Sequence, residues 1–208
     1  MTHVYDIPTA HTPPGGYGAE MPPPILADCD DPLVDGAPDL RGIWKVVSGE
    51  SNGEPLAPDN PIWGHVERIE QAADRVVVTS SGVVHDMVAD GTLESGVHDV
   101  MAADLTTPIR VAASFEDAVL VLRPDAMPGV EVRRRRDGEQ LVWEYHTLFT
   151  VRMERLDGAT SGRPACSIPL WVAVASSRCP GSVVVGESNS PPAPSPSSST
   201  TCCRSTTR

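Results

Sequence analysis

Two histidines are the side chains in this sequence whose spacing best suits acid–base or binding chemistry. The triplet Val-His-Asp occurs twice, at 84–86 and 97–99, so His85 and His98 hold equivalent places in two similar segments. Paired histidines can exchange protons, orient a polar ligand or bind a metal. A zinc site would need further ligands, and the five cysteines all lie outside 40–157. We therefore expect no metal, and the simplest interpretation is two partly buried histidines.

Arg134 is the third candidate, within the run 133–136 of four arginines. It follows Val130 and Val132 at a period of two residues, and this pattern turns it toward the same face as the two valines. An unpaired guanidinium in a protein interior is very costly. We therefore expect Arg134 to meet a carboxylate, either from the protein or from a ligand.

The segments that carry these residues have the pattern of antiparallel strands. Apolar residues alternate with a period of two, and turn sequences such as Ser81-Gly82 and Asp137-Gly138 separate the segments. Strands are expected near 41–49, 63–71, 75–80, 83–89, 97–103, 109–116, 118–123, 130–136 and 140–156. The last must bend near residues 146–148, which gives about ten strands. This pattern predicts an all-β fold, a single antiparallel up-and-down barrel of about 8–10 strands, with a sandwich as the alternative.

Charged residues assign the faces of the two histidine segments. Asp86 and Asp99 belong outside the barrel, because a buried carboxylate without a partner is unfavourable. His85 and His98 then both face the interior. We expect segments 83–89 and 97–103 to pair directly as a hairpin. The two histidines then lie on one face only if the numbers of two paired residues add to an odd sum, as for 85 with 100.

Composition divides the 208-residue chain, whose net charge is −12, into three parts. We expect a disordered, Pro-rich acidic arm over 1–39, a barrel over 40–157 and a Ser/Pro-rich low-complexity tail over 158–208. The acidic charge argues against nucleic-acid binding, and the absence of a long apolar stretch argues against a membrane span. A cytoplasmic location is expected because no signal-peptide pattern is present. The oligomeric state is left open.

Three segments resemble intracellular fatty-acid-binding proteins, members of the calycin group that also includes lipocalins. Residues 42–50, Gly-Ile-Trp-Lys-Val-Val-Ser-Gly-Glu, resemble the first strand of that family, and 133–144 resemble its penultimate hairpin. Residues 150–156 resemble its final T-x-R-x-Y strand. The resemblance implies a barrel in which Arg134 and Arg152 bind the ligand carboxylate. Glu154 replaces the family's tyrosine and is expected to pair with Arg152.

The leading functional interpretation is non-enzymatic binding of a small apolar ligand, a fatty acid or another lipid-like molecule, inside the barrel. No cofactor is required. The candidate ligand-binding residues are Arg134, Arg152, Glu154, His85, His98, Tyr145 and Trp143.

Two other functions stay open. Nitrobindins share the barrel and bind haem through a histidine of a late strand, a position that His146 matches. A barrel enzyme could use His85 or His98 with Glu154 or Asp104 as an acid–base pair, although no nucleophile motif is present.

Overall fold

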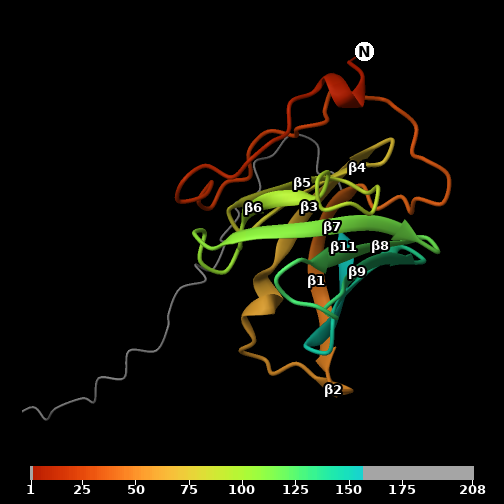
Figure 1. Cartoon of the computed structure of the whole chain (residues 1–208). Helices are drawn as coiled ribbons and strands as arrows, with labels where there is room; N and C mark the ends of the chain where they lie inside the picture. The colour runs from red at the N-terminus through yellow and green to blue at the C-terminus, as the bar shows by residue number, and fades with distance from the viewer. Residues whose placement is uncertain (1, 157–208) are drawn as a thin grey trace, which may run out of the picture. The chain divides into compact units, whose positions relative to one another are not determined.

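The computed structural model of the protein describes residues 2–156 (Figure 1). The predicted tail over 158–208 lies outside these residues. The described part contains two short 3-10 helices, η1 (Val4–Asp6) and η2 (Pro61–Gly64). Its strands are β1 (Gly42–Ser51), β2 (Glu54–Pro55), β3 (Val66–Ala72), β4 (Arg75–Ser80), β5 (Val83–Val88), β6 (Val97–Val100), β7 (Pro108–Glu116), β8 (Val119–Pro124), β9 (Val132–Asp137), β10 (Gln140–Tyr145) and β11 (Phe149–Arg155).

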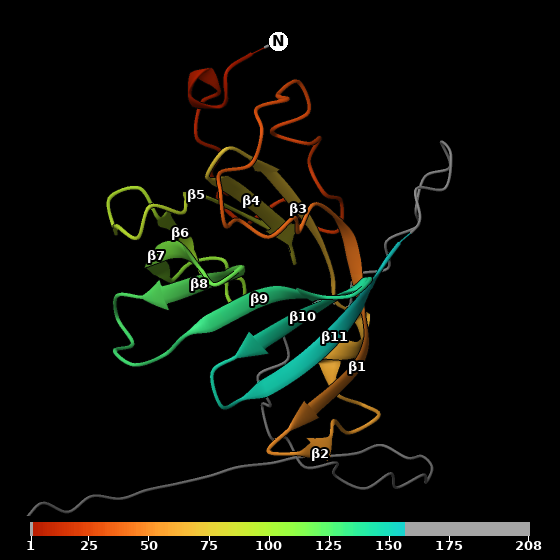
Figure 2. The same cartoon turned by 90° about the vertical axis from the view of Figure 1, so that its right-hand side faces the viewer.

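Ten of these strands form one antiparallel sheet that curves into a nearly closed barrel. The order is β5-β4-β3-β1-β11-β10-β9-β8-β7-β6, and β2 pairs only with β1. Figure 2 shows β1 and β11 side by side, followed by β10, β9 and β8 around the wall. The predicted all-β up-and-down barrel is confirmed. The predicted bend in 140–156 is confirmed as well, since residues 146–148 connect β10 to β11.

The interior is a continuous apolar core. It holds Trp44 of β1, Trp143 of β10 and Met153 of β11, each more than nine-tenths buried. On β10 and β11 the odd-numbered side chains point inward, because Leu141, Trp143 and Val151 belong to this core. The prediction that Trp44 and Trp143 lie in the core is confirmed. Within the described residues, no helix is long and apolar enough to cross a bilayer.

The barrel closes incompletely where β5 meets β6, and we call this place the seam. The sheet order begins at β5 and ends at β6, with no ladder between them. Val88 N–H donates to Ser95 O at one end of the seam, 2.8 Å away. An isolated bridge joins Asp90 to Ser114 beyond it. The predicted direct hairpin between segments 83–89 and 97–103 is therefore wrong.

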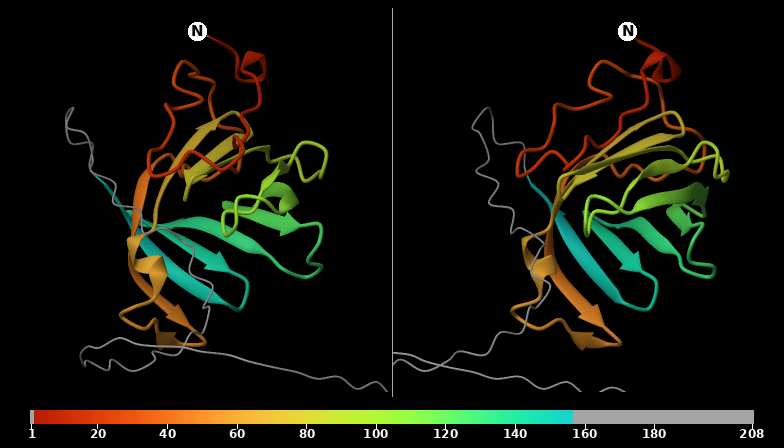
Figure 3. Two further views of the ribbon diagram at one scale, coloured as in Figure 1. Left: turned by 90° about the vertical axis from the view of Figure 1, so that its left-hand side faces the viewer. Right: turned by 60° about the vertical axis from the view of Figure 1, so that its left-hand side comes forward.

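The N-terminal arm is ordered, contrary to the expectation for 1–39. Residues 2–39 lie against the outer face of β3, β4 and β5 (Figure 3). Val4 and Leu26 of the arm form a second apolar cluster with Ala72, Val77 and Val84 of the barrel. Burial of these side chains on both partners offsets the conformational entropy of an arm that has few apolar residues of its own.

A buried ion pair also holds the arm. Arg75 forms a bidentate pair with Asp86, and both side chains are at least 95% buried. The same guanidinium donates to the carbonyl oxygens of Val4, Ile7 and Pro8 at 2.7–2.9 Å. One charged group thus satisfies three backbone acceptors of an arm that forms no sheet with the barrel.

Candidate functional site

A buried ion pair occupies the interior of the barrel. Arg134 of β9 donates through Nε and Nη2 to the two carboxylate oxygens of Glu67 on β3, each at 3.0 Å. Glu67 is fully buried and Arg134 is 6% exposed. The prediction that Arg134 faces inward and meets a carboxylate is confirmed, and the carboxylate comes from the protein.

Aromatic groups surround this pair. The Arg134 guanidinium lies 4.9 Å from the centroid of the Trp143 indole, and the His65 ring lies 4.9 Å from the same indole. Phe149 meets Trp143 edge-on at 5.0 Å, and Tyr145 lies 5.6 Å from Phe149. His65 lies between η2 and β3, and the other three aromatic residues come from the β10–β11 hairpin. They form a cluster at the end of the barrel that β2 and η2 adjoin.

The indole N–H of Trp143 is the unsatisfied group of this cluster. Its Nε1 is buried and has no hydrogen-bond partner among the described residues. A buried donor without a partner carries a desolvation penalty of about 1–3 kcal/mol. The arrangement therefore leaves one buried polar group without a partner among the described residues at this end of the barrel.

Neighbouring groups keep the carboxyl of Glu67 ionised. Burial raises the pKa of this carboxyl, but the charge of Arg134 and the hydrogen bonds from His65 and Arg134 outweigh burial and lower it from 4.5 to about 2. Glu67 is thus ionised over the whole physiological range, and the pair with Arg134 is neutral as a unit.

The Glu67 pKa predicts acid sensitivity of the fold. Because the folded-state pKa lies below the unfolded one, Glu67 stabilises the protein fully above about pH 4.5 and loses this contribution as the pH falls toward 2. We expect a loss of about 3 kcal/mol from this group. Urea denaturation at several pH values should show a weaker pH dependence in the double variant Glu67→Gln/Arg134→Met. Parallel curves for the two proteins would contradict the assignment.

His85 and His98 do not share a face. His85 points inward with Met87, and its Nε2 lies 3.0 Å from Val100 O across the seam. Burial lowers the pKa of His85. His98 is exposed, because Val97 takes the inward position on β6. The prediction that both histidines face the interior is therefore wrong.

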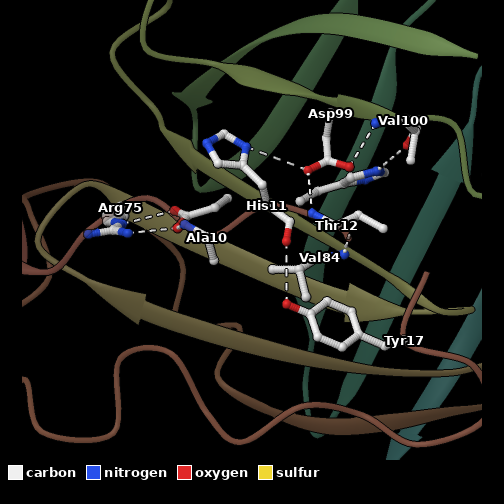
Figure 4. A network of polar contacts seen from close by, with 10 residues as sticks. Ala10, His11, Thr12, Tyr17, Arg75, Val84, Asp99 and Val100 are labelled. Carbon is white, nitrogen blue, oxygen red and sulfur yellow. Dashed lines mark hydrogen bonds and ion pairs between the residues drawn. The ribbon is translucent and has the colours of Figure 1, made fainter. Parts of the chain in front are cut away.

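The reason for this error is the arm, which covers both aspartates. Asp99 shares the face of Val97, and its carboxylate accepts a hydrogen bond of 2.9 Å from Thr12 N–H (Figure 4). Asp86 does lie outside the barrel, where Arg75 pairs with it. An aspartate for which the sequence pattern predicts a solvent-exposed position is thus covered by a segment distant in the chain.

Arg152 and Glu154 lie on the outer face of the barrel. Both are exposed, because Val151 and Met153 take the inward positions on β11. Arg152 pairs with Asp137 at 2.7 Å, and the hydrogen bond from Arg152 lowers the pKa of that carboxyl. The predicted internal pair between Arg152 and Glu154 is therefore wrong, and of the two arginines mapped by resemblance only Arg134 is interior.

The residues of the two alternative functions are not brought together. His146 stands exposed in the β10–β11 turn with a left-handed backbone, φ 45°. Asp104 lies in an exposed loop, where hydrogen bonds from Thr107 and Thr106 lower its pKa to about 2. Among the described residues it forms no hydrogen bond or ion pair with His85 or His98. Neither the haem-ligand position nor the proposed acid–base pair forms a site within residues 2–156.

Glu67 and His65 are the site residues that the sequence reasoning missed. Arg68 and Glu70 lie on the opposite face of β3 from Ile69, so the same alternation places Glu67 inside with Ile69. That signal was present in the sequence. The pairing of Glu67 with Arg134 depends on which residues face each other across the barrel, and alternation along one strand does not encode this.

No family model matches the chain, and no curated protein matches its sequence. Among solved structures, one titled "Human cRBP IV" is similar at 10% identity and a TM-score of 0.38. The match covers 57% of this chain and 98% of that one.

Proposed function

We propose that the barrel binds a small, uncharged, largely apolar molecule at the end that holds Trp143, without catalysing a reaction. The observation that carries this proposal is the buried, unpartnered Nε1 of Trp143 beside an ion pair that is already neutral. A few directed polar groups within an apolar lining are typical of small-molecule sites.

The Glu67–Arg134 pair argues for an uncharged ligand. Both guanidinium donors that face Glu67 are engaged, and the carboxylate has a strongly lowered pKa. A ligand carboxylate placed here would add a second negative charge to a buried site, where two like charges are unfavourable. The fatty acid expected from the family resemblance is therefore disfavoured at this position.

The aromatic cluster supports an apolar ligand with one acceptor atom. Tyr145 and Phe149 are half-buried, so both have surface left to cover. Covering apolar surface contributes about 25 cal/mol per Å². A carbonyl, ether or hydroxyl oxygen of the ligand would accept the Trp143 N–H and relieve the cost of leaving it unpaired.

The first test compares an uncharged probe with an anionic one. Nile red is uncharged and carries a carbonyl, whereas a dansylated fatty acid carries a carboxylate. We expect Nile red to bind at least about tenfold more tightly, equivalent to ~1.4 kcal/mol. Titration followed by probe fluorescence, with native mass spectrometry of the purified protein for co-purified molecules, measures this. Tighter binding of the anionic probe would contradict an uncharged ligand, and binding of neither probe would contradict the function.

Two tryptophan variants locate the contact. Trp143→Phe removes the indole N–H and should weaken Nile red binding by about five- to tenfold, the value of one neutral hydrogen bond. Trp63→Phe is the matched control, because Trp63 also packs on the core but already donates from Nε1 to Ala57 O at 2.7 Å. Equal affinities of the two variants would place the ligand elsewhere.

A further inference from the structure

The seam between β5 and β6 is covered by the N-terminal arm rather than by a strand. Thr12 bridges it: its backbone N–H donates to Asp99 on β6, and its hydroxyl accepts from Val84 N–H on β5 at 3.0 Å (Figure 4). On either side, Ala10 N–H donates to Asp86 Oδ2 and Tyr17 N–H donates to Gly82 O, each at 2.8 Å. We call residues 10–17 the strap.

The strap is held mainly by hydrogen bonds and lies between two anchors that are more deeply buried. Its side chains are exposed or half-buried, whereas Val4 before it and Leu26 after it are almost fully buried. Arg75 fixes the first anchor, and Glu70 fixes the second by accepting Leu26 N–H at 2.7 Å. A segment with few buried apolar contacts between two well-packed points is the part expected to open first.

A surface depression and the apolar core meet at the seam. A depression of about 370 Å³ lies beside the strap, and Thr12, Asp99 and Ile109 are among its lining residues. Ile109 also packs against the interior core. Beneath the strap, His85 reaches across the seam to Val100 O. Ile109 thus belongs both to the lining of the outer depression and to the packing of the apolar interior.

We propose that the strap is a gate, and that its release opens the seam as the route by which an uncharged apolar molecule enters the barrel. This inference rests on the proposed binding function. A gate on the route changes how fast the ligand enters and leaves, and leaves the affinity of the occupied site unchanged.

Two adjacent glycines of the strap give a matched pair of variants in the full chain. Gly15 and Gly16 both have left-handed backbones, with φ of 83° and 74°. A Cβ on Gly16 would lie 2.8 Å from Gly82 O and 3.0 Å from a Leu105 methyl, whereas one on Gly15 would meet nothing within 4 Å. Gly16→Ala should therefore displace the strap, and Gly15→Ala adds a similar backbone cost without the clash.

The experiment has two readouts. Amide hydrogen exchange at Val84 reports the strap without any ligand, and we expect it to be at least about tenfold faster in Gly16→Ala than in Gly15→Ala. Stopped-flow fluorescence with Nile red should show association and dissociation both faster by at least about fivefold in Gly16→Ala, with the dissociation constant within about twofold of the Gly15→Ala value.

The two proposals fail in different ways. Faster Val84 exchange with unchanged Nile red rates would overturn the entry route while the binding function stands. Equal Val84 exchange in the two variants would show that the strap does not open there and would overturn the gate directly. If Nile red binds to neither variant nor the wild type, the binding function fails and the entry route fails with it.

Discussion

Replacement of Glu67 by glutamine is expected to lower the free energy of unfolding by about 3–5 kcal/mol. The substitution removes the carboxylate that both accepts from and neutralises Arg134, while the guanidinium stays buried among Trp143 and the rest of the core. A buried charge that loses its partner is strongly destabilising, because the remaining amide oxygen of glutamine can accept a hydrogen bond but supplies no opposite charge. Urea denaturation at pH 7 measures the change.

A double variant separates the lost pair from a simple packing defect. Glu67→Gln/Arg134→Met removes both charges and should recover most of the stability lost in Glu67→Gln. Glu144→Gln is the control, because it breaks the partly exposed pair with Arg135 and should cost no more than about 1 kcal/mol. If Glu67→Gln costs as little as Glu144→Gln, the two interior charges are not paired as described.

Replacement of Arg75 by methionine is the second change with a large expected effect. It leaves Asp86 buried without its cation and removes the donors to Val4, Ile7 and Pro8 carbonyl oxygens. We expect a loss of about 3–5 kcal/mol in the free energy of unfolding, together with release of the first part of the arm. Urea denaturation measures the change in the free energy of unfolding.

Proteolysis measures the release of the first part of the arm. Residues 1–39 contain no Lys or Arg, so trypsin does not cleave the arm, and subtilisin is the suitable enzyme. Arg75→Met should be cleaved within residues 4–17 at least about tenfold faster than the wild type. Arg41→Met serves as the control, since Arg41 pairs with the exposed Asp39 and should change neither measurement appreciably. Equal cleavage of Arg75→Met and Arg41→Met would show that Arg75 does not hold the arm.

The barrel was predictable because its signal is local. Alternation and turn sequences gave the strand positions, and the parity of β9 placed Arg134 inside before any pairing was known. Parity also argued against the position of Arg152, since Val151 and Met153 are the apolar residues of the last strand. At this strand the family resemblance implies an interior Arg152, whereas the local pattern implies an exposed one. The structure agrees with the local pattern.

The docked arm was not predicted, although a signal for it exists. Residues 76–78 are three consecutive valines, and 83–84 are two more, so these segments do not alternate. A continuous apolar run indicates a strand that is covered on both faces. The second face is covered by residues about 70 positions earlier in the chain, through Arg75, Asp86 and Thr12. The composition of the arm alone did not contain this information.

The strap also affects which backbone groups of β5, at one end of the sheet order, another molecule can reach. Val84 N–H of β5 and Gly82 O, which directly precedes this strand, are groups that a strand from another molecule could pair with. Such pairing is the usual start of intermolecular sheet growth and aggregation. The strap occupies both, one through a threonine hydroxyl and the other through a single amide. Pro13 and Pro14 lie within the strap, and proline has no N–H to offer a further strand. The cover thus protects β5 without itself becoming a template for another chain.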